Sequence, residues 1–232
     1  MREIVFDTET TGLDPFQGDR IVEIGAVELI NHVPTGRKYH QYINPQRAMT
    51  AEVIAVHGLT DDFLSDKPIF AAIVDDFLNF IGTDSKLVAH NASFDMKFIN
   101  AELSWINKEP LSYERVIDTL LIAKQKFPGA RVNLNELCKR FNIDNSARTV
   151  HGALLDSELL AEVYLELLGG REPGLLDQKI IAETGVSQFE ETEMSAIKRE
   201  YHEPRTFNAT SVELEKHTEF VRKIKNNLWG IE

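Results

Sequence analysis

The order of strand-like and helix-like segments constrains the fold of this chain more than any other feature of its sequence. Three segments rich in apolar and β-branched residues follow one another near the N-terminus: residues 4–6, 20–31 and 38–43. Residues 33–36, with the sequence VPTG, are typical of a turn between the second and the third. This succession predicts three neighbouring antiparallel strands.

After these strands the pattern changes to alternating helices and short strands. An amphipathic helix is predicted to begin just after Pro68, because apolar residues recur at helical spacing through IFAAIVDDFLNFI. The short segments KLVAH and RVID predict two further strands. Helices are predicted at 94–105, 119–127, 134–141 and 153–168. Together these elements predict an α/β fold, with a mixed five-stranded sheet flanked by helices.

The character of the chain shifts after the double glycine at 169–170. Residues 171–208 carry scattered charges and little periodicity, which is typical of a linker. Thr210 and Glu213 fit a capping box, and one side of the following helix would carry Leu214, Val221, Ile224 and Leu228. A lone amphipathic helix needs a partner to bury its apolar side. We therefore expect a domain at 1–170, a linker, and a partner-binding tail at 209–232 that also contains Trp229.

Composition narrows the class of protein. The 232 residues include no run of about 18 apolar residues and no charged-then-apolar leader, so we expect a cytoplasmic protein without a membrane span. The single cysteine, Cys138, excludes an internal disulfide and is typical of a small buried hydrophobe. The formal net charge of −12 argues against a protein that neutralises long stretches of nucleic acid. It is compatible with one that holds a single chain end.

The stretch FDTETTG places two carboxylates directly after the first predicted strand. Asp7 and Glu9 are two positions apart, so in extended backbone both side chains point to the same side. Like charges held side by side repel unless something neutralises them. A divalent cation would do so, and so would solvent at the end of a strand; this stretch alone leaves both interpretations open.

Two further acids and a histidine follow later in the chain. Asp95, in HNASFD, stands at a helix start, where by itself an acid is explained by the helix dipole. Asp156, in HGALLD, lies on or beside the helix stripe that should face the sheet, where a carboxylate is costly unless paired or metal-bound. His151 precedes it by five residues, and a lone histidine is usually a surface residue. Four acids with a histidine suit two-metal phosphoryl chemistry, in which the histidine takes a proton from water.

The three motifs FDTETTG, HNASFD and HGALLD, in this order, resemble those of the DEDDh 3′→5′ exonuclease family. The histidine five residues before the last aspartate identifies the histidine branch of that family rather than the tyrosine branch. Over residues 1–170 the chain is similar to the proofreading subunits of bacterial replicative DNA polymerases. The resemblance implies a ribonuclease H-like fold and release of mononucleotides from a DNA 3′ end, with two divalent cations, Mg²⁺ or Mn²⁺.

The resemblance also implies residue roles. Asp7, Glu9 and Asp156 would hold the metal ions, Asp95 would assist, and His151 would be the general base. Contacts with the terminal nucleotide are implied for Thr8, Thr10, Gly12, Leu13, Glu52 and His57. Without the resemblance, His57 would be interpreted as an ordinary loop histidine.

The resemblance also implies binding partners, and two alternative functions remain open. The tail would bind the catalytic subunit of the polymerase. A contact with the sliding clamp is left open, because residues 171–176 depart from the glutamine-led motif that family members often carry there. One rival is a stand-alone exonuclease for RNA 3′ ends, which would not need the linker and tail. The other is a catalytically idle adaptor, against which the complete set of four acids and a histidine argues.

Overall fold

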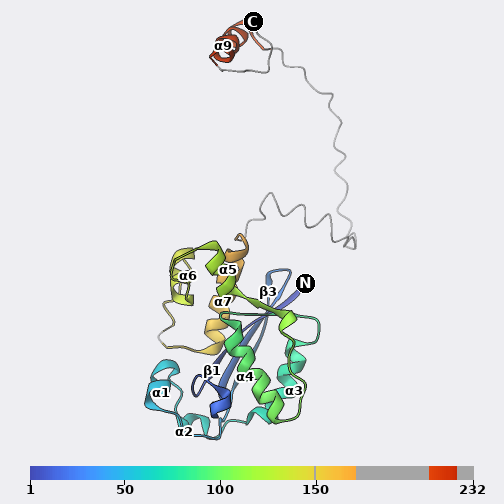
Figure 1. Cartoon of the computed structure of the whole chain (residues 1–232), viewed down its shortest axis with the longest axis vertical. Coiled ribbons are helices and arrows are strands. Elements are labelled where there is room, and N and C mark those ends of the chain that lie inside the picture. The colour runs from blue at the N-terminus through green and yellow to red at the C-terminus, as the bar shows by residue number, and fades with distance from the viewer. Residues whose placement is uncertain (149, 171–208, 224–232) are drawn as a thin grey trace. The chain divides into compact units, whose positions relative to one another are not determined.

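The computed structural model of the chain describes residues 1–148, 150–170 and 209–223 (Figure 1). These residues fall into two separate compact units, the first ending before and the second beginning after residue 184. The predicted linker 171–208, with its clamp-motif position, lies outside the described residues, as do Leu228 and Trp229. Among the described helices, none is long and apolar enough to cross a membrane.

The first unit is built on a mixed five-stranded sheet in the order β3-β2-β1-β4-β5. The strands are β1 (Arg2–Thr10), β2 (Ile21–Ile30), β3 (Val33–Tyr42), β4 (Lys86–Ala89) and β5 (Val116–Asp118). β1 pairs antiparallel with β2, and β2 pairs antiparallel with β3. β4 lies parallel to β1 and to β5. The predicted fold class is confirmed.

Two strand boundaries differ from the prediction. β1 continues to Thr10, so Asp7 and Glu9 lie within the strand rather than after it, and the two-residue periodicity holds through both carboxylates. The predicted turn at 33–36 is wrong, because the two-residue turn is formed by Asn31 and His32, at φ 50° and 65°. Two consecutive positive φ angles match the right-handed twist of a hairpin. Pro34 is tolerated in β3 because β3 is an edge strand.

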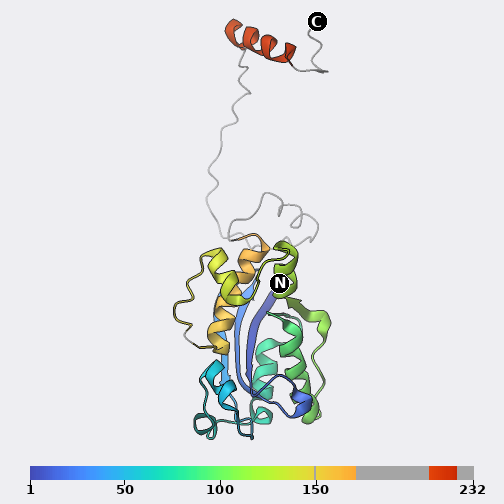
Figure 2. The same ribbon diagram turned by 60° about the vertical axis from the view of Figure 1, so that its left-hand side comes forward.

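Helices cover both faces of the sheet, as the two views show (Figures 1 and 2). α3 and α4 pack on one face and α7 on the other, with α5 and α6 packed against α7. The predicted helices have these bounds: α3 Phe70–Ile81, α4 Ala92–Trp105, α5 Thr119–Lys126, α6 Leu134–Phe141 and α7 Ala153–Leu168. Cys138 is fully buried in α6, as predicted. Two short helices, α1 (Ala51–His57) and α2 (Asp61–Leu64), were not predicted.

The alternation of side chains along β1 decides what each face of the sheet presents. Ile4 and Phe6 belong to the apolar cluster formed with α3 and α4. Val5 belongs to the opposite cluster, which includes Leu160 and Tyr164 of α7. Since side chains alternate with a period of two, Asp7 and Glu9 share the face of Val5 and look toward α7.

Gly25 allows α7 to begin directly on the sheet. It lies opposite Asp7 in the β1–β2 pair. A Cβ atom on Gly25 would collide with the backbone of Ala153 and Leu154, at the start of α7. The helix is further anchored by the Ser157 hydroxyl, which donates to the Gly25 carbonyl at 2.9 Å. The first turn of α7 is thereby held over the two carboxylates of β1.

The second unit contains helix α9 (Ser211–Arg222). The predicted capping box is confirmed: the Thr210 hydroxyl accepts from the Glu213 amide, and the Glu213 carboxylate accepts from the Thr210 amide. Val212, Leu214 and Phe220 are exposed apolar side chains of this helix.

Candidate active site

The four predicted carboxylates meet at one end of the sheet. Glu9 on β1 and Asp156 on α7 are 8% and 2% exposed. Glu9, His151 and Asp156 each offer a ligand atom, and these three atoms lie within 4.8 Å of one another. Asp7, two residues before Glu9 on the same strand face, interacts electrostatically with Glu9, Asp95 and Asp156.

Asp95 enters the cluster from the other side of the sheet. It lies in the first turn of α4 and is 3% exposed. Its Oδ1 accepts from both the backbone amide and the hydroxyl of Thr8, at 3.0 and 2.7 Å. Thr8 thus attaches the start of α4 to β1, between the two strand carboxylates.

His151 lies on the segment between α6 and α7, immediately before the helix. Its backbone amide donates to the Val56 carbonyl at 3.1 Å, which attaches this segment to α1. Its ring is about half-exposed, and Nδ1 lies 3.6 Å from Asp156 Oδ2. The ring therefore stands at the solvent side of the carboxylate cluster.

Arg148 is a charged residue of this site that the sequence did not reveal. Its side chain is 6% exposed and forms an ion pair with Asp156. Nothing in the sequence around it, DNSARTVHG, follows a helix or strand period, so no pattern indicated a buried arginine.

Crowding of acids governs the electrostatics of the site. Burial, reinforced by the neighbouring Asp95, Glu9 and Asp156, raises the pKa of Asp7 well above its usual range. Burial and the charges of Asp156, Glu23 and Asp95 raise the pKa of Glu9 to about 8. Burial also raises the pKa of Asp95 to about 7, against the hydrogen bonds from Thr8. The cluster therefore favours protons or another positive charge.

The donor set fits a divalent cation. Carboxylate oxygens are the ligands that Mg²⁺ and Mn²⁺ prefer, and a nearby cation would stabilise the ionised form of each acid. The ligand atoms of Glu9, His151 and Asp156 lie within 4.8 Å of one another, close enough for a single ion to reach them.

We expect the stability of the protein in a metal chelator to fall as the pH rises from about 5 to 8. A carboxyl whose pKa is raised in the folded state binds more protons there than in the unfolded chain, so raising the pH removes stability until the folded pKa is passed. Several degrees should be lost from the melting temperature. Saturating Mg²⁺ should flatten this dependence. The measurement is thermal unfolding across the pH range with chelator and with Mg²⁺.

The matched variant for this experiment is Glu9→Gln, which should weaken the pH dependence in chelator. Burial lowers the pKa of His57 and of His151, which acts in the opposite direction near pH 6. Comparing the pH dependence of the melting temperature with and without Mg²⁺ separates the contribution of the acids from that of these histidines. Equal slopes with and without Mg²⁺ would contradict a cation at the cluster.

The residues implied for nucleotide contact line one cavity of about 350 Å³. They are Thr8, Thr10, Gly12, Leu13, Glu52 and His57. Glu9 also lines this cavity, which therefore adjoins the carboxylate cluster. Three apolar side chains that no sequence pattern indicated, Val53, Val56 and Phe94, complete it.

His57 is not a loop histidine: it ends helix α1 and is 4% exposed. Its Nδ1 accepts from the Leu59 amide at 3.1 Å, so in the neutral ring the proton is on Nε2. That Nε2 is buried and makes no well-formed hydrogen bond among the described residues, although the backbone of Thr10 lies close enough to act on the pKa of the ring. A buried donor of this kind at a cavity wall favours a polar ligand.

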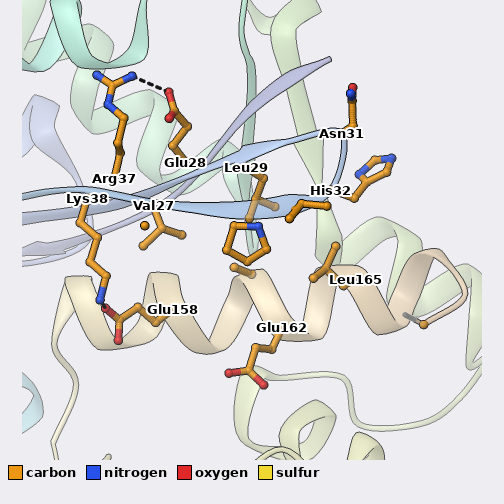
Figure 3. A pocket seen from close by; sticks show the side chains of 15 residues that line it. Val27, Glu28, Leu29, Asn31, His32, Arg37, Lys38, Glu158, Glu162 and Leu165 are labelled. Carbon is orange, nitrogen blue, oxygen red and sulfur yellow. Dashed lines mark hydrogen bonds and ion pairs between the residues drawn. The ribbon is translucent and has the colours of Figure 1, made fainter. Parts of the chain in front are cut away.

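A second and larger cavity, of about 760 Å³, lies elsewhere on the first unit, between the β2–β3 hairpin and α7 (Figure 3). Its inner surface carries Val27, Leu29 and Leu165, and the ion pair between Lys38 and Glu158 crosses one end. None of the clustered carboxylates lines it. Although this cavity is the larger of the two, its lining lacks the clustered acids, so it is not the candidate catalytic site.

Comparison with known proteins points to nucleases. The family model RNase_T, described as "Exonuclease", matches residues 4–164. DNA polymerase III subunit epsilon of Rickettsia conorii is 50% identical, with 97% of this chain and 96% of that protein covered. The subunit of the same name from Salmonella typhimurium is 43% identical, with 93% and 90% covered.

Two solved structures share the fold. Exonuclease X in complex with 5′ overhanging duplex DNA has a TM-score of 0.54 at 24% identity, over 71% of this chain and 90% of that chain. The nuclease domain of 3′hExo, a DEDDh family member bound to rAMP, has a TM-score of 0.61 at 19% identity, over 72% and 91%. At these identities the likeness establishes the arrangement of helices and strands.

Proposed function

The chain belongs to the RNase T exonuclease family, and we propose that it is a 3′→5′ DNA exonuclease that serves as the proofreading subunit of a replicative DNA polymerase. The observation that carries this proposal is the full-length match to polymerase III epsilon subunits, which spans the residues of both units. The carboxylate cluster beside a small cavity supports the nuclease activity.

Enzymes of this family use divalent metal ions. We propose that Asp7, Glu9 and Asp156 hold two such ions, Mg²⁺ or Mn²⁺, with Asp95 assisting. Bound there, the ions would polarise the terminal phosphodiester and lower the pKa of the attacking water. Asp95 also has a structural task, because its bonds to Thr8 keep β1 and the start of α4 together.

His151 is proposed as the general base. Burial and the charge of Arg148 lower its pKa, so the ring is neutral at pH 7 and can accept a proton. Arg148 Nη2 donates to Nδ1, so in the neutral ring Nδ1 carries the lone pair, and it is the nitrogen proposed as the proton acceptor. The backbone bond to Val56 fixes the segment that presents the ring.

The cavity beside Glu9 is proposed to receive the terminal nucleotide. The Nε2–H of His57 is available to a sugar or phosphate oxygen, and Glu52 is exposed at the same cavity. Val53, Val56 and Phe94 offer apolar surface to a base of any identity. The described lining thus has little to read base edges.

We therefore expect fraying of the primer end to decide which substrate is cut. A paired 3′ nucleotide must unpair and unstack before it enters the cavity, which costs a few kcal/mol and least at a mismatch. Single-stranded DNA should be degraded fastest, mismatched primer ends next and paired ends slowest, with little dependence on base identity. The measurement is digestion of the three DNA substrates in Mg²⁺, with an RNA primer alongside.

The same assay separates the rival functions. Faster cleavage of the RNA primer than of single-stranded DNA would favour a stand-alone RNA exonuclease. Absence of cleavage of any substrate by a folded protein would favour an adaptor role. A strong base preference on single strands would refute recognition through backbone and apolar contacts.

A further inference from the structure

Arg148 holds both oxygens of Asp156. Its Nε donates to Oδ1 at 2.5 Å and its Nη2 to Oδ2 at 2.6 Å, the two-pronged geometry in which a guanidinium binds a carboxylate most strongly. The same Nη2 lies 2.9 Å from His151 Nδ1, and Nη1 donates to Asn135 Oδ1 on α6 at 3.0 Å. The side chain is thus held by groups on α6, on α7 and on the segment between them.

These contacts involve two of the three groups whose ligand atoms lie within 4.8 Å of one another. Asp156 and His151 belong to that trio, with Glu9 as the third member. A guanidinium carries only donors and cannot itself ligate a metal ion. A cation bound through Asp156 must therefore take an oxygen that now accepts from Arg148.

We propose that Arg148 is a built-in counter-ion of the active site, which holds Asp156 and His151 together until a divalent metal ion displaces it. The inference rests on the proposed function, because it takes the carboxylate cluster as the metal site. It assigns Arg148 a positioning role: it offsets the repulsion among the acids before metal binds, and it competes with the metal for Asp156.

The direct test observes the side chain in the full-length protein. The ¹⁵N–¹H resonance of the Arg148 Nε–H group, assigned by its loss in Arg148→Gln, should shift or broaden as Mg²⁺ is added without DNA. Its midpoint should coincide with that of the backbone amides of β1. If those amides saturate while the Arg148 signal stays unchanged, the displacement is refuted. If the β1 amides do not respond to Mg²⁺, the metal site and the proposed function fail as well.

The second test measures Mn²⁺ affinity by calorimetry. A hydrogen bond to a charged group is a strong competitor, so Arg148→Gln should bind Mn²⁺ about tenfold more tightly or better. Arg131→Gln removes the same charge from an exposed position and should change the affinity less than twofold.

Arg148→Lys separates displacement from simple charge repulsion. Lysine keeps the positive charge but cannot span both oxygens of Asp156 and reach His151 with one fixed fork. The proposal expects Arg148→Lys to bind Mn²⁺ more tightly than the natural protein and less tightly than Arg148→Gln. An affinity equal to that of the natural protein would show that charge alone acts and would overturn the proposal.

Discussion

Asp7→Ala is expected to abolish nuclease activity while leaving the protein folded. The side chain lies among three other acids, and burial with their charges raises its pKa far above the usual range. Removing one member of a repelling set should not lower the melting temperature measured in chelator. Activity should fall by at least about 10³-fold, since bound metal supplies several kcal/mol of transition-state stabilisation. The measurements are thermal unfolding and digestion of a single-stranded primer in Mg²⁺.

Two matched variants sharpen this experiment. Asp75→Ala makes the same change at an exposed position on α3, where the carboxylate pairs only with Lys108 among the described residues, and should leave the rate unchanged. His151→Ala should lower the rate by about 10²–10⁴-fold while Mn²⁺ binding is largely retained, as expected of a base. If metal binding is lost together with the rate in His151→Ala, the histidine is a ligand. Retained turnover in folded Asp7→Ala would refute the metal assignment.

The placement of the acids could be predicted because two simple periods carry it. The two-residue period of β1 put Asp7 and Glu9 on one face, and the helical period of α7 put Asp156 on the side that packs against the sheet. The predicted end of β1 is wrong, but the inference about Asp7 and Glu9 still holds, because extending β1 to Thr10 preserves the alternation of its side chains. The inference about Asp156 does not depend on that boundary. The periodicity of long strands and helices therefore predicted the positions of the site residues that lie on β1 and α7.

The positions of the other site residues depend on tertiary contacts, which leave no periodic pattern in the sequence. Arg148 lies in an irregular segment, and its partners are set by how α6 and α7 pack, which single-sequence patterns do not report. Helix α1 has only seven residues, too few to show a helical period, so the sequence around His57 does not predict a helix. The predicted turn lies too late in the sequence because Pro34 and Gly36 suggest a turn more strongly than Asn31-His32 does. An edge strand tolerates proline, but only the tertiary structure shows that β3 is an edge strand.

Truncation after Gly170 is expected to abolish association with the polymerase while leaving degradation of free single-stranded DNA almost unchanged. The sheet, the carboxylate cluster and the cavity beside Glu9 all lie within residues 1–170. Helix α9 begins with a complete capping box and exposes apolar side chains, including Leu214 and Phe220, which a partner could bury. The measurement is a pull-down with the polymerase catalytic subunit and a nuclease assay on the same truncated protein.

Point variants of the full-length chain test the same prediction without removing the linker. Leu214→Ser should weaken the pull-down because it deletes exposed apolar surface from α9, whereas Lys216→Ser, also exposed on that helix, should not. A tethered nuclease is concentrated at the primer end, so loss of the tail should slow proofreading on a polymerase-bound primer far more than cleavage of free DNA. If the truncated domain binds the polymerase with full affinity, the tether lies within residues 1–170, and the domain assignment of 171–208 as linker and 209–232 as tail fails with it.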